Sequence, residues 1–119
     1  MITIRVEECE GLIVGLESEG HAHSRGDASG EYRIACAAVS SGLRAFAELL
    51  GSRSDVHAVG EAPSPGVFSV RVRAVDSTQW YRGACDLLRT ELRLVERDYP
   101  DQLTLHVIET GECAQVADC

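Results

Sequence analysis

Residues 2–16 read ITIRVEECEGLIVGL, and their pattern decides the fold class. Over residues 2–7, apolar and polar side chains alternate, which is the period of a half-buried strand. Residues 12–16 return to apolar side chains at every second position after a turn at Glu10 and Gly11. Two such runs joined by a short turn are typical of a β-hairpin. The chain is therefore predicted to begin with two antiparallel strands.

The apolar period changes to three and four residues in two later stretches. The first, about Tyr32–Leu50, has the single apolar stripe of an amphipathic helix, with Gly51 suited to its end. The second follows a capping-box sequence at residues 76–79 and ends at Tyr99, because Pro100 disfavours helical geometry before it. The stripes consist of Cys36, Val39, Leu43, Phe46 and Leu50, and of Tyr81, Ala84, Cys85, Leu88, Leu92 and Val95.

Further strands are predicted between and after the helices. Alternating residues indicate a strand over 68–72 and another over 103–107, and a shorter one is expected over 56–60 before a turn at 61–66. The resulting order ββαββαβ predicts an α+β fold in two layers. Its mainly antiparallel sheet has two helices packed on one face. A length of 119 residues suits one domain over residues 1–119.

Composition and charge narrow the class of partner. The formal net charge is −8, and all eleven basic residues are Arg. This balance argues against a nucleic-acid binder and leaves room for a basic protein partner. We find no apolar stretch near the roughly 20 residues of a membrane helix, and no basic region followed by an apolar run at the N-terminus. The predicted location is therefore the cytoplasm, with no membrane partner.

The five cysteines are Cys9, Cys36, Cys85, Cys113 and Cys119. No two of them form a CxxC pair, so the sequence has no zinc signature. In a cytoplasmic protein they are expected to be mostly reduced thiols, and most free cysteines behave as small buried apolar residues. At most one or two are expected to do chemistry.

The candidate chemistry lies between Gly20 and Cys36. Residues 20–30 are rich in glycine and lack an apolar period, which predicts a long loop. His21 lies at the start of this loop, and Cys36 lies near the start of the first helix, where the helix dipole favours a thiolate. The two could form a nucleophile and its base. The residues alone favour the other interpretation, in which Cys36 is core filler on the apolar stripe and His21 is a solvated or capping loop residue.

Neighbouring residues could support this pair. Ser40 lies one turn after Cys36 and could bond to the sulfur or, equally well, to a carbonyl one turn back. The backbone N–H groups of Ala37 and Ala38 could stabilise an oxyanion. His21 and His23 could instead bind a metal with Cys36, but no further ligand is evident, so neither a metal nor a cofactor is predicted.

Three motifs together resemble the ribosomal-processing cysteine protease (Prp) family. They are Gly20-His21-Ala22, the run Ile34–Ser40 (IACAAVS), and Tyr99-Pro100-Asp101. The resemblance covers essentially the whole chain. Two departures are that Arg33 precedes Ile34 where the family usually has Asp, and that the His21-to-Cys36 loop is a few residues longer.

The resemblance implies a small cytoplasmic cysteine endopeptidase that forms a homodimer. Such enzymes remove the N-terminal extension of the precursor of the twenty-seventh large-subunit ribosomal protein. The family's nucleophile falls on Cys36 and its base on His21, and the loop from about Ala22 to Arg33 corresponds to a gate over the active site. A basic substrate would suit the acidic chain.

Two other functions stay open at this point. One is a non-catalytic ribosome-associated binding module with the same fold, and the other is a thiol redox or metal protein. The geometry of Cys36 separates the first of these from the protease, because a thiol sealed in the core could not act as a nucleophile.

Overall fold

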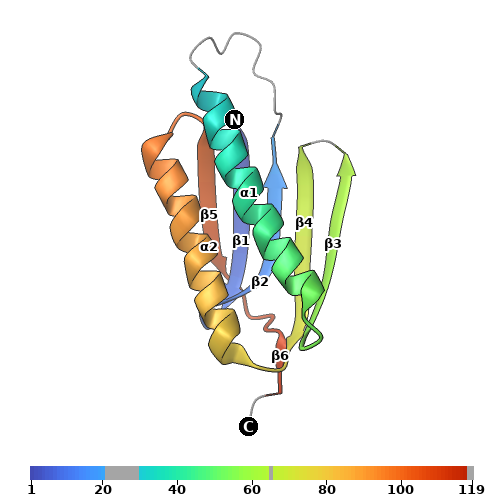
Figure 1. Ribbon diagram of the computed structural model, residues 1–119. Coiled ribbons are helices and arrows are strands. Elements are labelled where there is room, and N and C mark those ends of the chain that lie inside the picture. The colour runs from blue at the N-terminus through green and yellow to red at the C-terminus, as the bar shows by residue number, and fades with distance from the viewer. Residues whose placement is uncertain (21–29, 65, 118–119) are drawn as a thin grey trace.

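The computed structural model describes residues 1–20, 30–64 and 66–117. Its elements follow the predicted order, with one short strand added at the end. They are β1 (Ile2–Cys9), β2 (Leu12–Glu19), α1 (Glu31–Ser52), β3 (Val56–Ser64), β4 (Val67–Val75), α2 (Thr78–Asp98), β5 (Leu103–Glu109) and β6 (Gln115–Val116). Both helices lie side by side on one face of the sheet (Figure 1). The predicted α+β fold is confirmed.

The sheet is mixed, with antiparallel pairs in its centre. The strand order is β3-β4-β2-β1-β5, and β6 pairs with β4. The pairs β1–β2, β2–β4 and β3–β4 are antiparallel, whereas β1–β5 and β4–β6 are parallel, so the predicted first hairpin and mainly antiparallel sheet are confirmed. Parallel pairing brings the starts of β1 and β5 together at one end of the sheet and their last residues together at the other.

The helix stripes predicted from the sequence form the core against this sheet. Every residue of the α1 stripe is buried except Cys36, and every residue of the α2 stripe is buried except Ala84. Cys36 and Ala84 are partly buried and pack against the same core cluster. The six buried residues of α1 recur at steps of three and four, as an amphipathic helix requires.

One buried tyrosine ties α2 to the hairpin. Tyr81 is fully buried, and its hydroxyl donates a hydrogen bond of 2.6 Å to the carbonyl oxygen of Ile13 on β2. The backbone N–H of the same Ile13 donates to the sulfur of Cys85 at 3.4 Å. Burial raises the pKa of Tyr81, so the hydroxyl keeps its proton as the donor.

Tyr81→Phe is expected to lower the free energy of unfolding by about 1–2 kcal/mol, because it leaves the buried Ile13 carbonyl without this donor. Urea unfolding followed by circular dichroism measures the change. Tyr99→Phe is the matched control, since Tyr99 is only partly buried against the core. Equal effects of the two substitutions would contradict a specific role for the Tyr81 bond.

Several element ends differ from the sequence prediction. β3 continues to Ser64 through the predicted turn, and α1 continues through Gly51 to Ser52. Ser77 is the N-cap of α2, but its side chain makes no cap hydrogen bond. β6 was not predicted, because a strand of two residues is defined by its pairing with β4 and has no local pattern of its own.

By length and composition alone, α1 could cross a membrane. It has 22 residues, and the mean hydropathy of its most apolar window is 1.3. By this measure the prediction that no stretch has such a length is wrong. The helix is nevertheless one-sided. Its stripe packs on the sheet while Arg33, Arg44 and Glu48 on its other faces are exposed, as in the core helix of a globular domain.

Cys9 and Cys113 form a disulfide with their Cα atoms 5.2 Å apart, at a sequence separation of 104. The expectation that these two are reduced thiols without a role is therefore wrong for this structure. The parallel β1–β5 pair explains the proximity. Glu8 pairs with Glu109, so both strands finish at the same end of the sheet, where Cys9 is the last residue of β1 and Cys113 follows β5. Cys85 is a free, fully buried thiol, as predicted, and Cys119 lies outside the described residues.

Candidate active site

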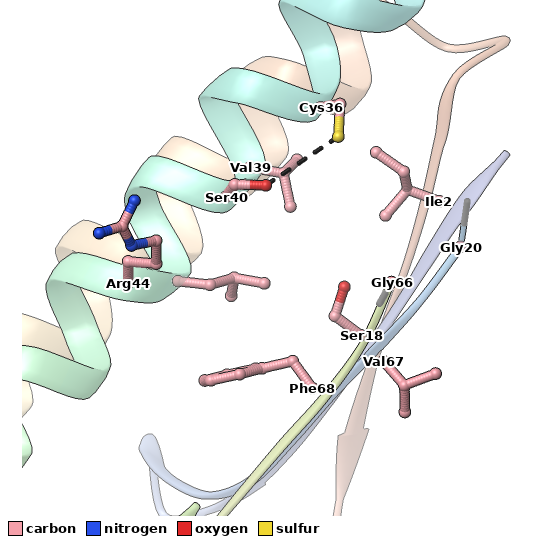
Figure 2. Close-up of a pocket in the computed structure, with 11 residues that line it drawn as sticks. Ile2, Ser18, Gly20, Cys36, Val39, Ser40, Arg44, Gly66, Val67 and Phe68 are labelled. Atoms are coloured by element: carbon pink, nitrogen blue, oxygen red, sulfur yellow. Dashed lines mark hydrogen bonds between the residues drawn. The ribbon is translucent and has the colours of Figure 1, made fainter. Parts of the chain in front are cut away.

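A groove of about 230 Å³ opens between α1 and the strand ends opposite it (Figure 2). Its walls are largely apolar, with a few polar groups from α1 and β2. The residues that line it are Ile2, Ser18, Gly20, Cys36, Val39, Ser40, Leu43, Arg44, Gly66, Val67 and Phe68. Such a lining suits an apolar side chain held beside a small number of polar groups.

The Cys36 thiol faces this groove. Figure 2 shows its sulfur on the side of α1 that is turned towards the opposite strands. Cys36 is only partly buried, so the thiol is not sealed in the core. This geometry removes the objection that the residue is inert filler. Cys85 shows the contrast, because burial raises the pKa of its thiol and nothing reactive can approach it.

Ser40 lies beside Cys36, as the helical spacing predicts. The distance from the Cys36 Sγ to the Ser40 Oγ is 4.0 Å, and either atom could be the donor. Both residues line the groove. A hydroxyl at this place can orient the thiol or a group bound next to it.

The position at which α1 begins decides which backbone N–H groups lack a hydrogen-bond partner within the helix. The helix begins at Glu31, so Cys36 is its sixth residue and lies in the second turn. Ala37 and Ala38 follow it inside the helix, where backbone N–H groups bond to carbonyls four residues back. Their proposed role as oxyanion donors stays a prediction, and the helical bonding makes these two N–H groups poorly available for it.

Gly20 is the last described residue before His21, and its place is fixed by close backbone contacts. Its N–H donates a hydrogen bond of 2.9 Å to the carbonyl oxygen of Gly66. A Cβ atom at Gly20 would lie 2.7 Å from the carbonyl oxygen of Met1 and 2.8 Å from the Cα of Ile2. The sequence motif therefore has a physical reason for glycine at its first position.

Gly20→Ala is expected to lower peptide-cleaving activity by about tenfold to a hundredfold, because displacing the backbone at the mouth of the groove also displaces His21, the next residue. Steady-state kcat/KM measures this. Gly83→Ala is the control, since a Cβ there meets nothing within 4 Å. Unchanged activity in Gly20→Ala would show that the glycine has no positioning role.

His21 and His23 lie in the segment 21–29, outside the described residues, so the Cys36–His21 pair stays a prediction. The predicted gate from Ala22 to Arg33 extends too far. Gly30 is the left-handed N-cap of α1, and Glu31–Arg33 form the first turn of that helix. Arg33 is exposed on the helix surface.

Some lining residues were not singled out from the sequence. Ser18 and Phe68 reach the groove because β2 and β4 pair there, with Ser18 opposite Phe68. No local pattern predicts that pairing. Tyr32 is not part of this lining, but it lies one turn before Cys36 on α1, and its helical spacing could have identified it as a neighbour of the thiol. Burial, with the Cys36 thiol nearby, raises the pKa of Tyr32, so its phenol stays neutral.

Among residues 1–20, 30–64 and 66–117, no group of three or more His, Cys, Asp or Glu side chains is placed to hold a metal ion. The polar side chains in the described lining of the groove are the Cys36 thiol, the hydroxyls of Ser18 and Ser40, and Arg44.

An accessible cysteine on a helix of this α+β fold, beside an apolar groove, fits the class of small thiol-dependent hydrolases. The sequence model of the family "Cysteine protease Prp" matches residues 1–104. The chain belongs to this family and is a cysteine protease, as the sequence motifs predict.

Solved structures show the same fold. SMU.848 from Streptococcus mutans superimposes with a TM-score of 0.74 at 18% identity, covering 92% of this chain and 96% of that one. The ribosomal processing protease Prp from S. aureus, in complex with a covalently linked product peptide, gives a TM-score of 0.72 at 20% identity, covering 90% and 99%. The same S. aureus enzyme with a substrate peptide gives 0.73 at 16% identity, also covering 90% and 99%. The search of curated proteins found no match.

Proposed function

We propose that this cysteine protease is a processing endopeptidase with Cys36 as nucleophile and His21 as general base. The observation that carries the proposal is the Cys36 thiol, open to a groove whose far wall includes Gly20, the residue directly before His21. The volume of the groove, about 230 Å³, and its largely apolar lining suit a peptide side chain. Membership in the Prp family supports peptide hydrolysis as the reaction.

The proposed reaction is acyl transfer. His21 takes the thiol proton, and the Cys36 sulfur forms a bond to the scissile carbonyl carbon. The tetrahedral intermediate then expels the amine, which receives the proton from His21, and a thioester remains. Water, deprotonated by His21, attacks the thioester, and the Cys36 thiol and a carboxylate are released. Ser40 is proposed to orient the sulfur or His21 from one turn away.

We propose as substrate the precursor of a basic large-subunit ribosomal protein, the twenty-seventh, from which an N-terminal extension is removed. Two findings support it: the family match, and the S. aureus relative, a ribosomal processing protease solved with a substrate peptide. The charge of −8 would attract a basic substrate. We further propose a cytoplasmic homodimer without direct nucleic-acid contacts, whose domain spans residues 1–119.

The test is incubation of the precursor from the same organism with the purified protein, followed by intact mass measurement. The expected product lacks the N-terminal extension, and a precursor produced without the extension stays uncut. Binding of the precursor without cleavage would overturn the protease assignment and support the non-catalytic binding module. If the organism's precursor has no extension, this substrate is excluded.

A further inference from the structure

The groove beside Cys36 has a cation on its rim and no acidic residue among its described lining. Arg44 lies one turn after Ser40 and two turns after Cys36 on α1, and Figure 2 shows its guanidinium turned away from the strands of the opposite wall. Within the part of the chain that the structure describes, Arg44 has no ion pair. Arg71 and Arg89, by contrast, bind Glu7 and Glu8. Because the Arg44 side chain is exposed and has no ion pair to hold it there, rotation about its side-chain bonds can bring the guanidinium to a group bound at the rim of the groove.

We propose that Arg44 is a specificity-determining residue that binds a substrate carboxylate about three or four residues from the scissile bond. Cys36 and Arg44 are eight positions apart on α1, which corresponds to about 12 Å along a helix at 1.5 Å per residue. An extended peptide covers this distance in about three or four residues, at roughly 3.3 Å each. The inference rests on the proposed peptidase function of the same groove.

The charge distribution makes this preference local. At long range the chain, with its net charge of −8, disfavours an acidic peptide. At the rim of the groove the guanidinium offers a planar pair of donors that fits a carboxylate. A glutamate or aspartate in the substrate therefore favours binding only at the position that reaches Arg44, and disfavours it elsewhere. An effect at one substrate position can therefore be assigned to Arg44, because the net charge of the protein would act on every position alike.

The experiment uses a parent peptide cleaved by the wild-type protein, with its scissile bond located by mass spectrometry. Glutamate and glutamine are exchanged one position at a time up to five residues on either side. At one position three or four residues away, glutamate is expected to lower KM about threefold to tenfold relative to glutamine. Arg44→Ala is expected to abolish this difference, and Arg44→Glu to reverse it in favour of glutamine, with kcat little changed.

Arg93→Ala is the matched control, because it removes the same charge from an exposed position on α2. The Kd values of the same peptides for Cys36→Ala, with and without Arg44→Ala, give a readout independent of turnover. Three results would overturn the proposed role of Arg44 and leave the proposed function standing. They are a glutamate preference that persists in Arg44→Ala, a preference that is absent at every position, and a preference that falls equally in Arg93→Ala. Absence of both wild-type cleavage and Cys36→Ala binding would overturn the proposed function as well.

Discussion

Cys36→Ala is expected to lower kcat/KM for the precursor by about 10⁴-fold or more, because Cys36 carries the only thiol among the described residues that line the groove. The Ser40 hydroxyl lies 4.0 Å from the sulfur but cannot replace a thiolate at neutral pH. Single-turnover cleavage measured by mass spectrometry has the range to detect such a loss. His21→Ala is expected to cause a loss of similar size, since the two residues act as a unit.

The control for this loss is the other free thiol among the described residues. Cys85 is fully buried on α2, so Cys85→Ala is expected to lower stability and leave kcat/KM within about twofold at a temperature where it is folded. Alkylation gives a second readout, because iodoacetamide should label Cys36 and spare Cys85 in the native protein. Cleavage that persists in Cys36→Ala would refute the nucleophile assignment, and labelling of Cys85 before Cys36 would refute the accessibility argument.

Cys9→Ala/Cys113→Ala is expected to lower the free energy of unfolding by about 4–5 kcal/mol relative to the oxidised protein, which is the chain-entropy effect for a loop of about 100 residues. The bridge closes almost the whole chain, since the two cysteines lie at a sequence separation of 104. Urea unfolding, with and without dithiothreitol, measures the difference. The double variant should unfold at the same urea concentration in both conditions, and the wild-type protein should approach it only when reduced.

Activity provides an independent readout of the bridge. Cys9 lies at the opposite end of β1 from Ile2, which lines the groove, so kcat/KM of the folded double variant is expected to stay within about twofold. Cys119→Ala is the control for loss of a cysteine without loss of the bridge. If the urea midpoint of the wild-type protein is the same with and without dithiothreitol, the bridge does not contribute to stability in solution. In the reducing cytoplasm that we propose, the reduced form is the relevant one.

The local pattern was sufficient for every element except the two-residue strand β6, and for one candidate residue. Period-two alternation identified β1, β2, β4 and β5, and the 3.6-residue stripe identified both helices, because these periods reflect which side of each element is buried. The stripe also contained an ambiguity at Cys36, which fits both a core position and a nucleophile. The motif Gly20-His21-Ala22 with Cys36 pointed to the protease interpretation.

Tertiary structure decided what the pattern left open, because contacts between residues distant in sequence have no local period. It placed Cys36 at a groove by bringing Ser18 and Phe68 of the paired strands opposite α1. The parallel β1–β5 pair brought Cys9 to Cys113, which the spacing of five cysteines could not indicate. The side-chain periods, beginning with the alternation in residues 2–16, thus determined the kind of fold. The pairing of strands determined that Cys36 lies at a groove and that Cys9 lies next to Cys113.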